Sequence, residues 1–203
     1  MAVMHFGENN TWININSDLI SEYSSIYDTY EIDDEMIEYA LDKNERAHME
    51  YNRRTKTLVL IYNVLNLTRE ENYYDTIPLT FIVRQNQIVT ISNEQNEYII
   101  DQIREELEEN MHWSVFNFLL HSLFTISENY FPILETLNKE QQKISKLLRK
   151  KTTKDNLFRL SDMEIEGMYL VSATKQNAVV LEQLKTQQAF KELDDSEREQ
   201  LED

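Results

Sequence analysis

Cysteine, glycine and proline are nearly missing from this sequence of 203 residues, which has no cysteine, two glycines and two prolines. Without cysteine there is no disulfide framework, no thiolate zinc cluster and no cysteine nucleophile, which fits a reducing compartment. Two isolated glycines, Gly7 and Gly167, cannot form a glycine-rich loop that approaches a phosphate, so neither a dinucleotide fingerprint nor a P-loop is present. We therefore do not expect an enzyme that binds nucleotides through such a loop.

Basic charge and long apolar runs are also scarce. Twenty basic against 37 acidic residues leave a formal charge of −17, which repels phosphate backbones and attracts cations, so we expect no nucleic-acid partner. The densest apolar stretch, Val115 to Ile126, is interrupted by Asn117, His121 and Ser122 and is shorter than the roughly 18 to 20 residues that a spanning helix needs. The first ten residues lack the basic and apolar segments of a signal peptide, so we expect an intracellular chain.

The first half of the chain has the alternation and composition of an α/β region. Trp12 to Ile15 alternates apolar and polar residues and predicts a half-buried strand, and Ser17 or Asp18 can cap a short helix that continues to Ile26. A second helix is predicted over 31–42, with Asp33 or Asp34 as its cap. Four further strands are predicted at 47–52, 57–65, 77–83 and 87–91, the last two forming a hairpin across 84–86.

After residue 97 the apolar period lengthens to that of a helix. A helix is predicted from Ile99 to Leu107, and 111–151 is predicted as one long helix with a kink or break at Pro132. A turn at 151–156 leads into a second long helix over 157–193. The spacing of three and four on this helix predicts a seam of Leu160, Met163, Gly167, Leu170, Thr174, Asn177, Leu181, Leu184 and Gln188. The fold class is therefore α/β: a mixed β-sheet flanked by helices over 1–96, then a helical region over 97–203 with a long antiparallel helix hairpin.

The predicted hairpin tip carries a charge opposite to that of the rest of the chain. Residues 139–159 hold 8 basic and 2 acidic residues, a net charge of 8 − 2 = +6, which leaves −17 − 6 = −23 elsewhere. Either this is a solvated helix end, or the tip meets an acidic surface of another subunit or anionic lipid headgroups.

No set of residues has the spacing of a known catalytic motif, so we do not expect an enzyme. The four histidines are scattered, and neither a His-Glu-x-x-His pair nor a Gly-x-Ser-x-Gly elbow occurs. Carboxylates four residues apart, Asp34, Glu38 and Asp42, would share one helix face, where a divalent cation could relieve their repulsion. A solvated acidic surface is the alternative interpretation.

The order of these segments resembles the cytoplasmic domain of the CorA family of magnesium transporters. The resemblance begins with Thr11-Trp12-Ile13-Asn14-Ile15 and continues with the segment Ile37 to Asp42, then Glu45-Arg46 and Glu50-Tyr51. Strand-like segments 58–64, 78–83 and 88–91 and the helical segment 130–148 follow in the family's order. The family's Gly-Met-Asn motif is absent, and Gly167-Met168-Tyr169 in a polar helix is not that motif. We expect a soluble piece cut before the transmembrane helices.

The resemblance implies a regulatory or sensor domain of a homopentameric channel at the cytoplasmic face of the cell membrane, with Mg²⁺ as regulatory and transported ion and cobalt or nickel as alternatives. It further implies self-association and a membrane connection through a missing C-terminal segment, so this fragment alone should transport nothing and be a monomer or dimer. An acidic pair of the family's interface sensor aligns with Glu38 and Tyr39. Because a phenol is a poor ligand for Mg²⁺, the site is either lost or rebuilt from Asp34 and Asp42. The alternative function is a stand-alone helical protein-interaction module.

Overall fold

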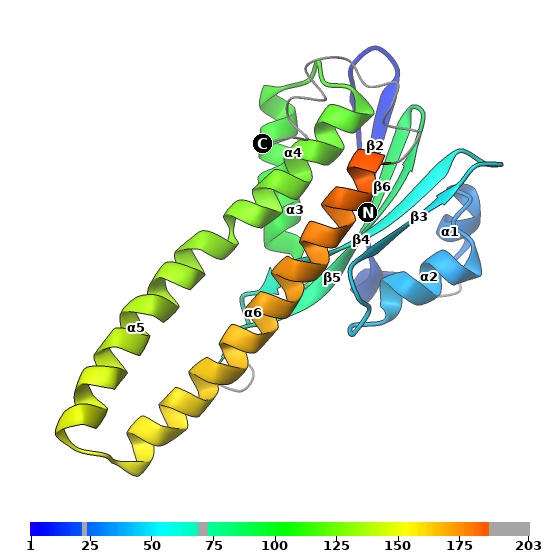
Figure 1. Ribbon diagram of the computed structural model, residues 1–203. Helices are drawn as coiled ribbons and strands as arrows, with labels where there is room; N and C mark the ends of the chain where they lie inside the picture. Colours follow the sequence, from blue (N-terminus) through cyan, green and yellow to red (C-terminus); the bar gives the residue numbers. More distant parts are fainter. Residues whose placement is uncertain (22–23, 69–72, 187–203) are drawn as a thin grey trace.

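The computed structural model describes residues 1–21, 24–68 and 73–186, and contains a six-stranded mixed sheet with helices on both faces and a long helix hairpin (Figure 1). The strands are β1 (Ala2–Phe6), β2 (Asn10–Asn16), β3 (His48–Asn52), β4 (Thr57–Asn66), β5 (Asp75–Arg84) and β6 (Gln87–Ser92). Their order is β1-β2-β6-β5-β4-β3, with β2 and β6 parallel and every other pair antiparallel. The predicted mixed sheet is confirmed, including the hairpin of β5 and β6.

The helices divide between the two faces of the sheet. They are α1 (Ser25–Thr29), α2 (Asp34–Leu41), α3 (Glu97–Glu109), α4 (Val115–Glu128), α5 (Tyr130–Lys150) and α6 (Lys154–Thr186), with a 3-10 turn at Ser17–Leu19. The short helices α1 and α2 lie on one face, while α3, α4 and α6 cover the other (Figure 1).

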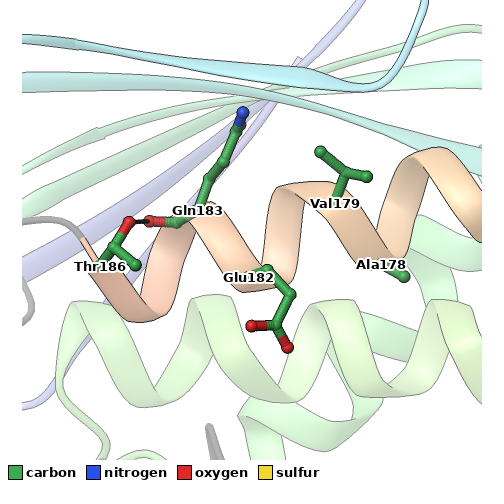
Figure 2. A pocket seen from close by; sticks show the side chains of 5 residues that line it. All are labelled: Ala178, Val179, Glu182, Gln183 and Thr186. Atoms are coloured by element: carbon green, nitrogen blue, oxygen red, sulfur yellow. Dashed lines mark hydrogen bonds between the residues drawn. The ribbon is translucent and has the colours of Figure 1, made fainter.

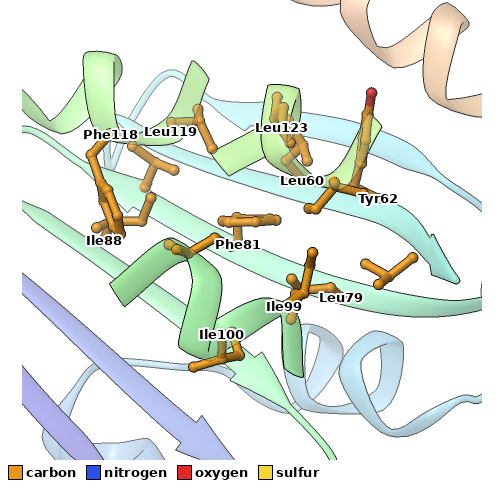
Figure 3. Close-up of a cluster of buried hydrophobic side chains, with 14 of the residues drawn as sticks. Leu60, Tyr62, Leu79, Phe81, Ile88, Ile99, Ile100, Phe118, Leu119 and Leu123 are labelled. Atoms are coloured by element: carbon orange, nitrogen blue, oxygen red, sulfur yellow. The ribbon is translucent and has the colours of Figure 1, made fainter. Parts of the chain in front are cut away.

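Each face of the sheet has its own hydrophobic core, because successive residues of a strand point to opposite sides. The smaller core contains Ile13, Ile82 and Val89 and packs against α1 and α2. The larger core packs β4, β5 and β6 against α3 and α4; Phe81 lies among side chains of both helices, such as Ile99 (Figure 3). Residues of the sheet region and of the helical region thus belong to one packed cluster.

Strand β2 is more buried than predicted. A half-buried strand was expected from its alternation, but β2 lies inside the sheet between β1 and β6, and both of its faces are covered. Its polar residues are therefore buried with partners. The Trp12 indole donates to Thr90 Oγ1 over 3.0 Å, and the hydroxyls of Thr90 and Ser92 donate to Asn14 Oδ1 over 2.8 and 3.1 Å. These hydrogen bonds account for the Trp-Ile-Asn-Ile pattern on this strand.

Two predicted helix boundaries in the first half were wrong. Instead of one helix from Ser17 or Asp18 to Ile26, the 3-10 turn ends at Leu19 and α1 begins at Ser25; residues 22–23 lie outside the described part. The reason is local capping, since Ser24 accepts a hydrogen bond from the Ile26 amide and starts a new helix. The helix predicted over 31–42 begins at Asp34, with Asp33 as its cap.

The segment predicted as one long helix is two helices, α4 and α5. The break falls at Asn129, whose side-chain amide donates to Gln102 of α3 over 2.8 Å. Pro132 lies in the first turn of α5, where its missing amide hydrogen needs no partner, so it is tolerated without a kink. Of the two predicted effects of this proline, the break is the one observed.

The helix hairpin turns at residues 151–153, within the predicted turn of 151–156; α6 begins at Lys154 rather than at 157 and runs back toward the sheet (Figure 1). Four predicted seam residues are buried, and at three other positions the buried residue lies one position earlier because α6 packs against both α5 and the sheet. The buried row is Met163, Glu166, Leu170, Ala173, Asn177, Val180 and Leu184. The prediction was wrong for four positions that are only half-buried: Leu160, Gly167, Thr174 and Leu181. Gln188 lies outside the described residues.

Asn177 fastens this helix to the sheet. Strand β3 pairs with β4 only as far as Ile61, so the backbone of Asn63 has no strand partner on that side. The Asn177 amide bonds both groups of that backbone: Oδ1 accepts from the Asn63 N–H and Nδ2 donates to the Asn63 carbonyl, each over 2.9 Å. The Tyr130 hydroxyl donates to the same carbonyl over 2.9 Å, so α5 and α6 are both tied to β4.

Candidate functional site

The predicted acidic site lies on helix α2, which the sequence orients through its cap and its apolar residues. The Asp33 side chain accepts a hydrogen bond from the Met36 amide over 3.0 Å and begins the helix. Met36, Ile37 and Ala40 pack against the smaller core of the sheet. The side of the helix that carries Asp34, Glu38 and Asp42 is therefore turned to solvent, and all three side chains are exposed.

The three carboxylates form a row along α2. Residues four apart are about 6 Å apart along the axis at a rise of about 1.5 Å per residue. The negative charge of Asp34 in the first turn interacts favourably with the helix dipole, whereas the negative charge of Asp42 at the carboxyl end interacts unfavourably with it. Asp42 Oδ1 accepts from the Asn44 amide over 2.9 Å and retains a second oxygen. The row is thus a concentration of negative charge that a cation would relieve at its carboxyl end.

Tyr39 does not face this row but two other carboxylates. Its hydroxyl lies 3.1 Å from Glu35 Oε1 and 3.5 Å from Glu50 Oε1 on β3, and its ring packs edge-on against His48 at 5.0 Å. The hydrogen bond to Glu35, followed by desolvation and the negative charge of Glu50, raises the pKa of Tyr39 to about 12. Tyr39 is therefore a neutral donor near pH 7, not an anionic metal ligand.

A pocket of about 270 Å³ opens between α2 and strand β3 beside this tyrosine. Its walls include the acidic residues Asp33, Glu35 and Glu50. The sequence analysis missed Glu35 and Glu50, although the spacing of four between Glu35 and Tyr39 already indicates a pair on one helix face. Glu50 could not be found in this way because it belongs to another element.

The donor chemistry of the row fits Mg²⁺ only in part. Carboxylate oxygens are the ligands that Mg²⁺ prefers, usually one or two of them with several waters. Within residues 1–21, 24–68 and 73–186, no group of three or more histidine, aspartate or glutamate side chains is arranged to hold a metal ion. A cation on α2 would therefore need waters or another chain to complete its coordination, and Asp34, Glu38 and Asp42 remain predicted ligands.

A second pocket lies on the surface of α6. It measures about 400 Å³ and is lined by Ala178, Val179, Glu182, Gln183 and Thr186, drawn in Figure 2. The Thr186 hydroxyl donates to the Gln183 carbonyl over 2.8 Å, and Glu182 lies 3.8 Å from Lys185. In the described part of the chain, no helix combines the length and apolar character that crossing a membrane requires.

The fold resembles solved structures of divalent-cation transporters at low sequence identity. The complete CorA magnesium transporter of Methanocaldococcus jannaschii matches with a TM-score of 0.81 and 18% identity, over 100% of this chain and 63% of that one. The soluble domain of the same CorA matches with a TM-score of 0.78 and 19% identity, over 96% of this chain and 77% of that one. The cytoplasmic domain of ZntB from Vibrio parahaemolyticus matches with a TM-score of 0.73 and 12% identity, over 96% and 76%.

These similarities show the fold, which is that of the CorA soluble domain, and the chain spans less than two thirds of the length of the complete transporter. The search of curated proteins gave no match. The model of the family described as CorA-like Mg²⁺ transporter protein matches residues 7–203, which is nearly the whole sequence. The chain therefore belongs to the CorA family of Mg²⁺ transporter-like proteins.

Proposed function

We propose that this chain is the cytoplasmic regulatory domain of a divalent-cation channel or transporter, with Mg²⁺ as the transported and sensed ion. The observation that carries the proposal is the family match over residues 7–203. The same match does not favour the alternative of a stand-alone interaction module. In this proposal the domain works at the inner face of the cell membrane as part of a homopentamer whose membrane segments belong to the rest of the protein.

Regulation would act through negative charge on neighbouring copies. Each chain carries a formal charge of −17, so copies held side by side repel one another. A cation bound at Glu38 and Asp42, and completed by waters or a neighbouring chain, would offset this repulsion and hold the copies together. Loss of the cation would let them separate. Asp34, one turn before Glu38, adds charge to the same face.

The proposed site is weak, because Tyr39 occupies the position where the family resemblance implies a second acid. A millimolar dissociation constant is then expected for a Mg²⁺ ion that keeps most of its waters. At about ten times this constant, one-site linkage stabilises the domain by about 1.4 kcal/mol. For a chain of this length that raises the melting temperature by about 3 to 6 °C.

The experiment compares thermal unfolding in MgCl₂ with unfolding in NaCl of equal ionic strength, since screening alone also stabilises an acidic chain. In the double variant Glu38→Ala/Asp42→Ala we expect the Mg²⁺-specific part of the shift to disappear. The matched control is Glu105→Ala/Glu109→Ala, which removes two exposed carboxylates four residues apart on α3. If both double variants keep the Mg²⁺-specific shift, the row on α2 is solvated surface and this part of the proposal fails.

The variant Tyr39→Asp supplies a second readout. An aspartate there would supply the acid that the resemblance implies at position 39, facing Glu35 and Glu50, and we expect it to strengthen the Mg²⁺-specific shift. Tyr39→Phe is its control, because it removes the hydrogen bonds to Glu35 and Glu50 without adding charge. Equal shifts in the two variants would mean that position 39 takes no part in cation binding.

A further inference from the structure

The tip of the helix hairpin carries basic side chains without acidic partners. Five of them lie at the end of α5, in the connecting loop and at the start of α6, and all are exposed: Lys146, Arg149, Lys150, Lys151 and Lys154. Among the described residues none of the five forms an ion pair. Basic residues farther from the tip do, since Lys139 lies 3.2 Å from Glu135 and Arg159 lies 3.9 Å from Glu140.

Helix stability accounts for only part of this charge. Arg149 and Lys150 end α5, where positive charge is favourable to the helix dipole. Lys154 begins α6, where the same charge is unfavourable. Lys151 lies in the loop between the two helices. A tip arranged for its own stability would carry acidic residues at the start of α6, and of its first turn only Asp155 is acidic.

Large apolar side chains are exposed beside these lysines. Leu147 is 39% exposed, Leu157 49% and Phe158 67%. Leu157 and Phe158 follow Lys154 at spacings of three and four, which places them on the same side of α6. Basic residues next to exposed leucine and phenylalanine are typical of helices that lie in the headgroup region of an anionic membrane.

The acidic residues of the sheet and of α1 and α2 are too far away to cancel the charge of the tip. The 21 residues of α5 correspond to about 32 Å at a rise of about 1.5 Å per residue. At physiological ionic strength the Debye length is about 8 Å, so the negative charge of the sheet and of α1 and α2, at the other end of α5, is screened at the tip. Figure 1 shows the tip projecting away from the sheet and from α1 and α2.

We propose that this hairpin tip docks onto an anionic lipid surface, with its lysines and Arg149 at the headgroups and with Leu157 and Phe158 in the interface. The proposal rests on the proposed function, since a regulatory domain of a transporter works beside a bilayer. An acidic surface of a second copy would also attract the lysines. It would not require an exposed phenylalanine among them, and for this reason the lipid surface is favoured.

The experiment is co-sedimentation of the 203-residue chain with vesicles made of equal parts of phosphatidylcholine and phosphatidylglycerol, and with vesicles of phosphatidylcholine alone. We expect binding to the anionic vesicles only. Each basic residue at the surface strengthens binding about fivefold, so Lys150→Gln/Lys151→Gln/Lys154→Gln should weaken it about a hundredfold. The matched control is Lys43→Gln/Lys175→Gln/Lys185→Gln, which loses the same charge at exposed positions away from the tip and should bind like the original chain.

Phe158→Ser separates the lipid surface from an acidic protein surface, because it leaves the charge unchanged. We expect it to weaken vesicle binding severalfold. Equal binding by the tip triple variant and its control would overturn the proposal. So would an absence of vesicle binding together with a salt-sensitive self-association that the tip triple variant abolishes, because the tip would then dock on another copy. The Mg²⁺-specific shift in the melting temperature of the chain is measured without lipid. Failure of the proposed cation site on α2 and failure of lipid docking by the tip can therefore be recognised separately.

Discussion

Replacing Asn177 by alanine should loosen helix α6 from the sheet at one defined point. The Asn177 amide makes two hydrogen bonds of 2.9 Å to the buried backbone of Asn63. In the alanine variant the Asn63 N–H has no partner, while the carbonyl keeps the Tyr130 hydroxyl at 2.9 Å. The damage is therefore one buried, unsatisfied donor and a small void beside it.

The expected loss follows from these two effects. A buried donor without a partner costs about 1 to 3 kcal/mol, and the void adds to this, so we expect the free energy of unfolding to fall by about 3 kcal/mol. Tyr130→Phe alone should cost about 1 kcal/mol, because the carbonyl then keeps its bond to Asn177. In the double variant the carbonyl also loses its last partner. The combined loss should therefore exceed the sum of the single losses by about 1 kcal/mol.

Urea unfolding followed by circular dichroism gives the free energy of unfolding of all three variants. In thermal unfolding the melting temperature of Asn177→Ala should fall by about 6 to 12 °C. The control is Gln183→Ala, an exposed residue on the same helix, which should change stability by less than about 0.5 kcal/mol. A loss below about 1 kcal/mol for Asn177→Ala, together with additive effects in the double variant, would refute the assignment of Asn177 as the fastening of α6.

The two glycines should respond in opposite ways to alanine. Gly7 has φ +55°, and a Cβ there would lie 2.9 Å from the Trp113 carbonyl, so Gly7→Ala should cost about 2 kcal/mol or more in urea unfolding. Gly167→Ala meets no atom within 4 Å on the middle of α6 and should stabilise the protein by about 1 kcal/mol; a loss there would contradict the packing described for α6. Burial lowers the pKa of His121, partly opposed by the charge of Glu106, so below about pH 6.5 the unfolded chain binds a proton that the folded chain does not. Stability should therefore fall as the pH falls through this range, and His121→Phe should reduce that slope in urea midpoints measured between about pH 7.5 and about pH 5.

The strands could be predicted because their signal is local. Runs such as Leu58 to Leu65 combine β-branched and aromatic residues over the length of one strand, and polar pairs such as Gln85 and Asn86 mark the hairpin between β5 and β6. The order of the strands within the sheet was not predicted, because the family resemblance concerned only their order along the chain. Burial of β2 on both faces depends on β1 and β6 lying on either side of it, and nothing within Asn10–Asn16 specifies that arrangement.

The seam of α6 shows why spacing alone is insufficient. Predicting the row from a spacing of three and four assumes a single partner helix, and it correctly selected Met163, Leu170, Asn177 and Leu184. The sheet is a second packing partner of α6. Because of it, every second buried residue lies one position earlier than predicted, so that Ala173 is buried where Thr174 was expected. The bond from Asn177 to Asn63 spans 114 residues, and no local pattern encodes it.

The candidate site has the same division between local and long-range information. The row of Asp34, Glu38 and Asp42 follows from helical spacing and is exposed as expected. The surroundings of Tyr39 do not follow from spacing, because Glu50 comes from strand β3. An acid at position 39 would face Glu35 and Glu50 as a third negative charge, and the three carboxylates would repel one another. The neutral hydroxyl of Tyr39, with its pKa raised to about 12, supplies a donor to those two carboxylates instead. Because this hydroxyl keeps its proton throughout the physiological pH range, its hydrogen bonds to Glu35 on α2 and to Glu50 on β3 persist over that range.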